Sequence, residues 1–573
     1  MKTSLVFICV IYLINGIQSD LNWWRNANFY QIYPRSFQDS NGDGVGDLNG
    51  ITSRLPYLKD LGIHGVWISP IFTSPMADIG YDISDFYNIH HEYGTLNDFD
   101  RLVGVAHDLG LKILLDFVPN HSSSENEWFK KSAINDDEYK DFYTWHPGRE
   151  DPENPAGRKL PPSNWRSVFR GSAWTYHEGR QEYYLHQFAT FQPDLNYRNP
   201  AVVDRMKGVL RFWLDRGVDG FRVDAVPNLF EVLPVDGHYP DEPLSGITTD
   251  PDSFDYVQHI YTVDQPETVE MLYQFREVLD EYTRKDGNMR VMMSESDSEI
   301  NLLMTYYGNG IRNGSHVPFN FYLLFNLDEN SNAEDFLRII RVWLDHIPKG
   351  QSPNWLIGNH DRNRTATRFG SDRVDLISMI INTLPGISIT YYGDEIGMTN
   401  VFVSWEESKD TAACSSDSDH YQAFTRDPAR TPFQWDSSTS AGFSTNIKPW
   451  LPVSPSYREV NAKVQKQSAR SHLKVYKKLL KLRTTETLMR GETTIKTNGK
   501  NVLTIVRQLS GHETYITVAN IGSSRETVDL RTIYHEQLTF HIVSMNSKRK
   551  EEEKIHGPIL VLEPRESVVL KGY

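Results

Sequence analysis

The chain contains very little cysteine. Its 573 residues include two, Cys9 and Cys414. Cys9 lies in an N-terminal segment with the pattern of a secretory signal peptide, so the processed protein would keep Cys414 alone. A disulfide within the mature chain is therefore excluded. Stability must come from packing, to which a bound metal could add.

Positive charge is scarce relative to negative charge. The chain has 59 Lys and Arg residues against 75 Asp and Glu residues, which gives a formal net charge of −16. An acidic surface repels phosphate backbones and anionic lipids. Nucleic acid and membrane surfaces are therefore disfavoured as partners. No pattern in the sequence indicates the oligomeric state.

Long hydrophobic runs are absent beyond the N-terminus. There Lys2 precedes an apolar stretch from Leu5 to Ile14, and small and polar residues follow through Ser19. This pattern is typical of a signal peptide over residues 1–19 and predicts a secreted, extracellular protein. No other segment approaches the length needed to cross a bilayer.

Three glycosylation sequons occur in the chain. Asn313-Gly-Ser and Asn363-Arg-Thr are compatible with a secreted glycoprotein. Asn120-His-Ser is also a sequon, but it lies inside a strand-end motif. We expect no attachment at Asn120.

Strand-like and helix-like segments alternate through residues 28–395. Near-continuous apolar strands joined by helices indicate a parallel sheet covered by helices. Eight such units predict an α/β fold, a (β/α)8 TIM barrel, with an open doubly wound sheet as the alternative. The expected strands begin at Phe29, Gly65, Lys112, Gly220, Arg290, His316, Asn354 and Gly386.

The remaining segments predict further domains. Residues 121–193 are rich in Trp, Pro, Asn and Gly and are too long for an ordinary connection, so we expect an inserted domain B after the third strand. Residues 20–120 and 194–488 would form the barrel, with a helical run from Val464 to Leu482. Alternating runs near the end predict a C-terminal antiparallel β domain over residues 489–573.

Three of the expected strands end in a carboxylate. These acids are Asp224, Glu295 and Asp361. A parallel barrel presents its catalytic groups at the carboxyl ends of its strands. Glycoside hydrolysis needs two carboxylates of opposed protonation, and a third can support the charged transition state. Alternation along the strand also places Arg222 on the same side as Asp224, where its charge would keep Asp224 ionised.

Five motifs occur in order along the chain: Asp116 to His121, Gln192 to Asn196, Gly220 to Asp224, Glu295, and Asn359 to Asp361. Together they resemble the alpha-amylase family of retaining glycoside hydrolases, and the resemblance extends over nearly the whole mature chain. Two further motifs, Gly80 to Asp85 and Ala429 to Asp436, are similar to the alpha-glucosidase and oligo-1,6-glucosidase branch, and the chain resembles the secreted insect maltases within it.

The resemblance implies a role for each acid. Asp224 would be the nucleophile, Glu295 the general acid/base and Asp361 the stabiliser of the transition state. The two reacting carboxyl groups would then lie roughly 5 to 5.5 Å apart. The residues that follow Glu295, Ser-Asp-Ser-Glu, differ from the Ala-Tyr that is common in the family.

The resemblance also implies a pocket for one glucose unit. Asp78 and Arg430 would hold the non-reducing hydroxyls, and Tyr81 would lie beneath the ring. A pocket closed at that end implies exo-action on short oligosaccharides, and Ala225 resembles the α-1,4-preferring members. The other expected sugar contacts are His121, Arg222 and His360.

A separate loop has the residue pattern of a calcium site. Oxygen-bearing residues alternate from Asp39 to Asp47, with Gly44 at the sixth position, as in the first nine positions of a calcium loop. The twelfth position is Gly50 rather than Glu, so the EF-hand is incomplete, and an Asp/Asn-rich turn is the alternative. By resemblance, structural Ca²⁺ would be bound by Asp39, Asn41, Asp43, the Val45 carbonyl and Asp47.

The predicted function is a secreted alpha-glucosidase that releases α-D-glucose from the non-reducing ends of maltose, sucrose and short α-1,4-linked oligosaccharides. The competing interpretation is a non-catalytic member of the same fold, such as a transporter accessory chain or a receptor. Retention of all three carboxylates and the absence of a hydrophobic C-terminal tail count against it. Transglycosylation, with a sugar hydroxyl in place of water, is not distinguished from hydrolysis by the sequence.

Overall fold

The structure is a computed structural model that describes residues 21–153 and 157–572. The predicted signal peptide lies outside these residues. Within them, no helix combines the length and the apolar character that a membrane span requires.

The centre of the molecule is an eight-stranded parallel sheet, as predicted from the alternation of strands and helices. Its order is β11-β10-β9-β5-β2-β1-β13-β12, which is the order of a barrel. Every strand begins within one residue of its predicted start. The strands are β1 (Asn28–Ile32), β2 (Gly65–Ile68), β5 (Lys112–Phe117), β9 (Gly220–Val223), β10 (Val291–Ser294), β11 (Val317–Pro318), β12 (Asn354–Trp355) and β13 (Ile387–Tyr391).

Side-chain amides connect the two ends of this strand order. The Asn320 backbone N–H donates to Asn354 Oδ1 at 2.9 Å, and Asn320 Nδ2 donates to the Asn354 carbonyl at 3.2 Å. Asn354 Nδ2 in turn donates to the Pro318 carbonyl. Among the described residues, no backbone ladder pairs β11 with β12, so these amides close the barrel.

Helices cover the outside of the barrel, and local sequence sets their ends. In α4 a capping box joins Thr95 and Asp98, and in α10 one joins Asn332 and Asp335. The main helices are α3 (Leu48–Leu61), α4 (Leu96–Asp108), α6 (Pro200–Asp215), α7 (Pro266–Asp286), α8 (Ile300–Thr305), α10 (Ala333–His346), α12 (Val374–Thr383) and α15 (His472–Arg483). Shorter ones are α2 (Pro34–Phe37), α9 (Tyr322–Asn326), α11 (Thr365–Phe369), α13 (Thr411–Cys414) and α16 (Glu486–Arg490).

The predicted helical run from Val464 to Leu482 is two helices rather than one. The first, α14 (Ala462–Gln467), ends at Ser468, whose backbone is extended. The second, α15, begins after Ser471, whose hydroxyl accepts from the Lys474 N–H. Serine side chains compete for backbone hydrogen bonds and favour helix ends, which explains the break.

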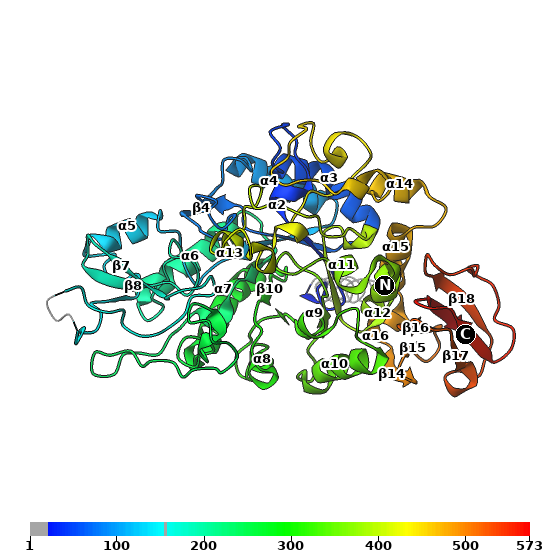
Figure 1. The fold of residues 1–573 in the computed structure, drawn as a ribbon. Helices are drawn as coiled ribbons and strands as arrows, with labels where there is room; N and C mark the ends of the chain where they lie inside the picture. The colour runs from blue at the N-terminus through cyan, green and yellow to red at the C-terminus, as the bar shows by residue number, and fades with distance from the viewer. Residues whose placement is uncertain (1–20, 154–156, 573) are drawn as a thin grey trace, which may run out of the picture.

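The segment after β5 forms a small antiparallel unit at one end of the molecule (Figure 1). A second long loop, after β9, packs against it, because Trp165 Nε1 donates to the Pro240 carbonyl at 2.9 Å and Tyr239 joins the same apolar cluster. The domain boundaries drawn from the sequence stay predictions. The elements are α5 (Glu127–Ala133), β6 (Trp145–His146), β7 (Trp174–His177) and β8 (Glu182–Leu185), with the nearby hairpin β3 (Phe72–Thr73) and β4 (Asp85–Ile89).

The C-terminal segment is the predicted antiparallel β domain, at the opposite end of the molecule (Figure 1). Five strands pair in the order β14-β15-β16-β20-β18, and β17 pairs with β19. Tyr515 and Val569 of this domain pack against Met379 of α12 and Leu479 of α15. The strands are β14 (Glu492–Asn498), β15 (Val502–Gln508), β16 (Thr514–Asn520), β17 (Glu526–Asp529), β18 (Leu538–Val543), β19 (Ile559–Leu562) and β20 (Ser567–Gly572).

Candidate active site

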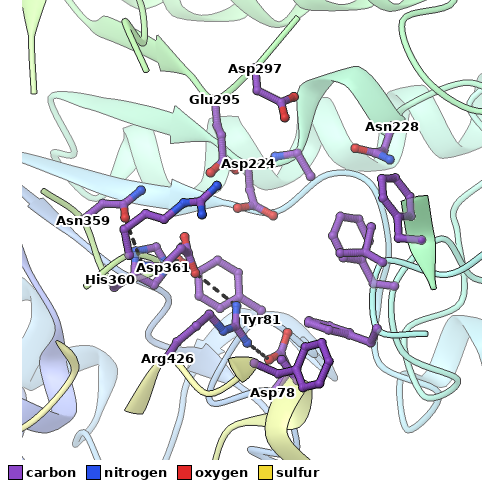
Figure 2. A pocket seen from close by; sticks show the side chains of 18 of the residues that line it. Asp78, Tyr81, Asp224, Asn228, Glu295, Asp297, Asn359, His360, Asp361 and Arg426 are labelled. Carbon is purple, nitrogen blue, oxygen red and sulfur yellow. Dashed lines mark hydrogen bonds and ion pairs between the residues drawn. The ribbon is translucent and has the colours of Figure 1, made fainter. Parts of the chain in front are cut away.

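A cavity of about 660 Å³ opens at the carboxyl ends of the barrel strands, beside the inserted segment. Asp224, Glu295 and Asp361 all line it, although they lie far apart along the chain (Figure 2). Strands β9 and β10 are neighbours in the sheet and place the first two acids side by side. Three of the predicted residues therefore meet in one hollow, as the strand-end motifs imply.

One buried guanidinium connects the acids of neighbouring strands. Arg222 Nη1 contacts both Asp224 Oδ1 and Asp116 Oδ1, the latter at 2.8 Å, while Nη2 lies 2.7 Å from Glu295 Oε1. Arg222 is 1% exposed and stands behind the carboxylates rather than in the cavity lining. In this structure it organises the acids, and its predicted contact with the sugar stays a prediction.

The backbone turns sharply directly after Asp224. Ala225 has φ +44°, a left-handed conformation that costs a non-glycine residue about 1–2 kcal/mol. In this conformation the Ala225 N–H donates to Glu295 Oε2 at 3.1 Å. The strain thus serves to fix Glu295 beside Asp224.

The two carboxyl groups differ in proton affinity. Burial, together with the nearby Asp224 and Asp361 charges, raises the pKa of Glu295 to about 8, although Arg222 opposes the shift. Burial also raises the pKa of Asp224, which Arg222 restrains to about 6. Near pH 7 Glu295 is therefore protonated while Asp224 is ionised, the opposed states that acid and nucleophile require.

Asp361 is ionised for a different reason. Burial alone would raise its pKa, but His360, Arg426 and Arg430 hold it well below the usual range. Burial lowers the pKa of His360 to about 3, so at neutral pH the two arginines supply the positive charge. Arg426 Nη1 lies 3.0 Å and Arg430 Nη2 3.1 Å from Asp361 Oδ1.

The predicted pairing of Asp78 with Arg430 is wrong. Arg426 lines the cavity and bridges Asp78 at 3.2 Å to Asp361 (Figure 2). Arg430 lies one turn further along, 1% exposed, and donates from Nε to the His360 carbonyl at 2.8 Å. A short 3-10 turn, Asp427–Ala429, separates the two arginines and directs them to different surroundings.

Asp78 lines the cavity from a strained loop. Met76, Ile79 and Gly80 all have positive φ values. The Asp82 carboxylate holds the loop by accepting from the backbone N–H groups of Ala77 and Asp78, each at 3.0 Å. Burial raises the pKa of Asp78 to about 6, against the lowering effect of Arg426.

Tyr81, for which a place beneath the sugar ring is predicted, lines the cavity. It stacks on His360 with ring centroids 5.4 Å apart and contacts His360 Nε2 through its hydroxyl at 2.6 Å. His121 also lines the cavity, and burial lowers its pKa to about 4, so it is neutral. Gln192 Nε2 lies 3.0 Å from Asp78 Oδ2 and 3.1 Å from His121 Nε2, so the motif after the insertion holds both of these side chains.

Several residues of the site were not predicted. Asp410 is buried and binds Arg426 at 2.6 Å, yet it lies in a polar loop with no motif to identify it. Arg426 lies in the same short segment as Arg430, so proximity to the motif was its only signal. Asp297 lines the cavity where the sequence departs from the family pattern. The unpredicted aromatic wall comprises Phe169, Phe188, Phe254, Phe321, Phe325 and Phe424.

The candidate calcium loop closes on its own N–H groups in the structure. Asp39 accepts from the Asn41, Gly42 and Gly44 backbones, and Asp47 caps α3 by accepting from Gly50. Among the described residues, no group of three or more His, Cys, Asp or Glu side chains is arranged to hold a metal ion. The residue types suit Ca²⁺, but their arrangement in this structure does not form a coordination shell.

Comparison with known proteins agrees with this geometry. The model of the alpha-amylase catalytic domain matches residues 31–491. Maltase A1 of Drosophila melanogaster is 50% identical over 569 residues, which cover 98% of each chain. A salivary alpha-glucosidase of Aedes aegypti is 51% identical over 523 residues, 91% of this chain and 90% of that one. A solved alpha-glucosyl transfer enzyme superposes with a TM-score of 0.82 at 32% identity, covering 96% and 99% of the two chains.

Proposed function

The chain belongs to the alpha-amylase family of glycoside hydrolases, and from this premise we propose that it is a secreted alpha-glucosidase that releases α-D-glucose from maltose, sucrose and short α-1,4-linked oligosaccharides. One observation carries the proposal: Glu295 and Asp224, from neighbouring strands, line the same cavity at the carboxyl ends of the barrel. Relatives named salivary alpha-glucosidase support secretion.

The proposed reaction is a double displacement. Glu295 donates its proton to the glycosidic oxygen while Asp224 attacks the anomeric carbon, so that the C–O bond to the leaving group breaks as a glucosyl ester forms. Ionised Glu295 then takes a proton from water, which attacks the same carbon and releases Asp224. Two inversions retain the α-configuration. Asp361, held ionised by Arg426 and Arg430, stabilises the positive charge on the ring.

We propose exo-action. Arg426 joins Asp78 to Asp361, and these charged groups would bind the terminal hydroxyls and close this end of the cavity to a longer chain. Tyr81 provides an aromatic face for the same glucose unit. We propose that Ala225, after the nucleophile, gives a preference for α-1,4 over α-1,6 linkages.

Product analysis tests this function. Incubation with maltose, isomaltose, sucrose and starch, followed by NMR of the first product, is expected to give α-glucose from maltose and sucrose, with slower turnover of isomaltose and starch. β-Glucose as the first product from sucrose, whose only glucose is the glycosyl unit bound by Asp224, would contradict retention. Longer sugars formed from maltose alongside its leaving glucose would indicate that transglycosylation dominates, the activity named for the similar transfer enzyme.

The opposed pKa values predict a bell-shaped pH profile. Asp224 must be ionised, so kcat/KM should fall as the pH drops below about 6, where its pKa lies. Glu295 must be protonated, so kcat/KM should also fall above about 8. Because the two groups interact, each limb of the profile reports an apparent pKa of the coupled pair rather than of one residue. Initial rates on maltose from pH 4 to 10 measure the profile. A profile that is flat from pH 6 to 10 would exclude Glu295 as the acid.

We also propose that Ca²⁺ binds the loop of Asp39, Asn41, Asp43, Val45 and Asp47. Binding would require the oxygens of these residues to converge on a shared ion, while lone pairs remain to accept from the backbone N–H groups. At a free concentration 100 times its Kd, the ion would stabilise the fold by about 2.7 kcal/mol. Chelation is therefore expected to lower the melting temperature, and Asp43→Ala to abolish that shift. An unchanged melting temperature after chelation would rule out the site.

A further inference from the structure

The three glycosylation sequons lie in three different surroundings. Asn120 is 1% exposed, and its Nδ2 contacts His121 Nδ1 and Asp194 Oδ1, each at 3.2 Å. This nitrogen is the atom to which a glycan would be attached, so the folded protein has no room for one there. Asn313 and Asn363 are both exposed.

The two exposed sequons lie at opposite ends of the barrel. Asn313 precedes β11, so it lies at the amino end of a strand, and it is not among the residues that line the cavity. Asn363 follows β12 and lines the cavity at the carboxyl end of the strands. In a parallel barrel the active site lies at the carboxyl end, so a substituent on Asn363 would adjoin it.

The surroundings of Asn363 suit attachment. Its Oδ1 accepts from Asn400 Nδ2 at 2.7 Å, which anchors the amide oxygen while the amide nitrogen points in a different direction. Asn400 also binds the next residue, because its Oδ1 accepts from the Arg364 N–H at 2.8 Å. The base of a glycan would therefore be held rather than free to swing away from the cavity.

The third residue of the sequon limits when attachment can occur. Thr365 is 7% exposed, and its hydroxyl donates to Asp394 Oδ2 at 3.1 Å. An enzyme that reads this hydroxyl must act before the segment folds. Attachment would thus belong to secretion and would be permanent in the mature protein.

Asn363 is also very close to the reacting centre. Only Arg362 separates it from Asp361, so their Cα atoms lie within about 7 Å of one another. The neighbouring Arg362 lies 4.4 Å over the ring of Phe325, and both line the cavity and are exposed. Asn363 therefore belongs to the mouth of the cavity, together with Asp297.

We propose that Asn363 carries an N-linked glycan that stands at the mouth of the cavity and limits the length of the sugar chains that react. The inference rests on the proposed alpha-glucosidase function. Because Arg426 closes the inner end, each additional glucose unit of a substrate must extend out through the mouth. A bulky glycan there leaves room for maltose and obstructs longer chains.

Two measurements on protein secreted from insect cells test the proposal. Mass spectrometry of the peptide around residue 363, before and after peptide N-glycosidase, shows directly whether Asn363 carries a glycan. The ratio of kcat/KM for maltoheptaose to that for maltose measures how well a long sugar chain reaches the active site. Asn363→Gln is expected to raise this ratio several-fold, and unglycosylated wild type made in bacteria should show the same rise. Asn313→Gln removes a glycan far from the cavity and should leave the ratio unchanged.

Each outcome decides the proposal. An unmodified Asn363 peptide, or an occupied one with no change in the ratio when the glycan is absent, would overturn it. If no form hydrolysed maltose, the proposed function would fail while the peptide mass still decided attachment. The affinities of the two sugars, measured by calorimetry with and without the glycan, would then decide access.

Discussion

Replacing Asp224 with asparagine is expected to reduce maltose hydrolysis on the order of 10⁴-fold or more, the scale of removing a nucleophile from an enzyme. The amide cannot form the glucosyl ester, and the neighbouring Asp116 is already engaged by other groups. Asp116 binds Arg222, the Trp67 indole and the Tyr81 hydroxyl. The fold should survive, because asparagine has nearly the same shape. Initial rates and circular dichroism measure both effects.

The matched control is Asp204→Asn, on the exposed face of α6. It makes the same chemical change far from the cavity, so its rate should equal that of the wild type. If Asp224→Asn retained activity within about tenfold of the wild type, the barrier would have changed by only about 1.4 kcal/mol. Asp224 could then not be the nucleophile.

Replacing Arg222 with methionine is expected to lower the free energy of unfolding by about 3–5 kcal/mol, the usual effect of removing one partner from a buried ion pair. Asp116, Asp224 and Glu295 would lose the guanidinium that they share. The pKa of Asp224 would rise further, which would move the acidic limb of the activity profile to higher pH. Chemical denaturation and pH–rate profiles measure the two effects.

The pH dependence of this destabilisation has a definite sign. Without Arg222 the folded carboxyl groups would hold protons at pH values where the unfolded ones, with pKa near 4, have lost them. The folded state then binds more protons, so stability falls as the pH rises. We expect a larger loss at pH 8 than at pH 5. Arg222→Lys keeps the charge but not the planar fork, and should be less destabilised; equal losses in both variants would contradict the electrostatic explanation.

The sequence was sufficient to predict the barrel and the meeting of its acids. Apolar strands such as β9 and β10 stop at a charged residue, and a parallel topology then brings these ends together however far apart they lie in the chain. The placement of Asp224 and Glu295 therefore followed from strand order, whereas Asp361 reaches the cavity from the loop after β12.

The loops could not be read in the same way. Arg426 and Arg430 lie four residues apart in one segment, and only the turn between them decides which enters the cavity. Asp410 and the phenylalanines of the wall lie in segments without periodicity, so no pattern distinguishes them from other loop residues. The split between α14 and α15 was likewise hidden, because serine caps compete with a helical pattern that continues on both sides.

The amide contacts of Asn320 and Asn354 have a consequence for where the barrel opens by local unfolding. The other neighbouring strands of the barrel are joined by backbone ladders, whereas among the described residues the seam between β11 and β12 has no ladder and is held by side-chain contacts such as those of Asn320 and Asn354. Local unfolding starts where the fewest cooperative bonds must break. The wall between β11 and β12 is therefore the natural place for the cylinder to part first. The segment that follows β12 would therefore be the first part of the site to lose its alignment; it contains Asn359, His360 and Asp361.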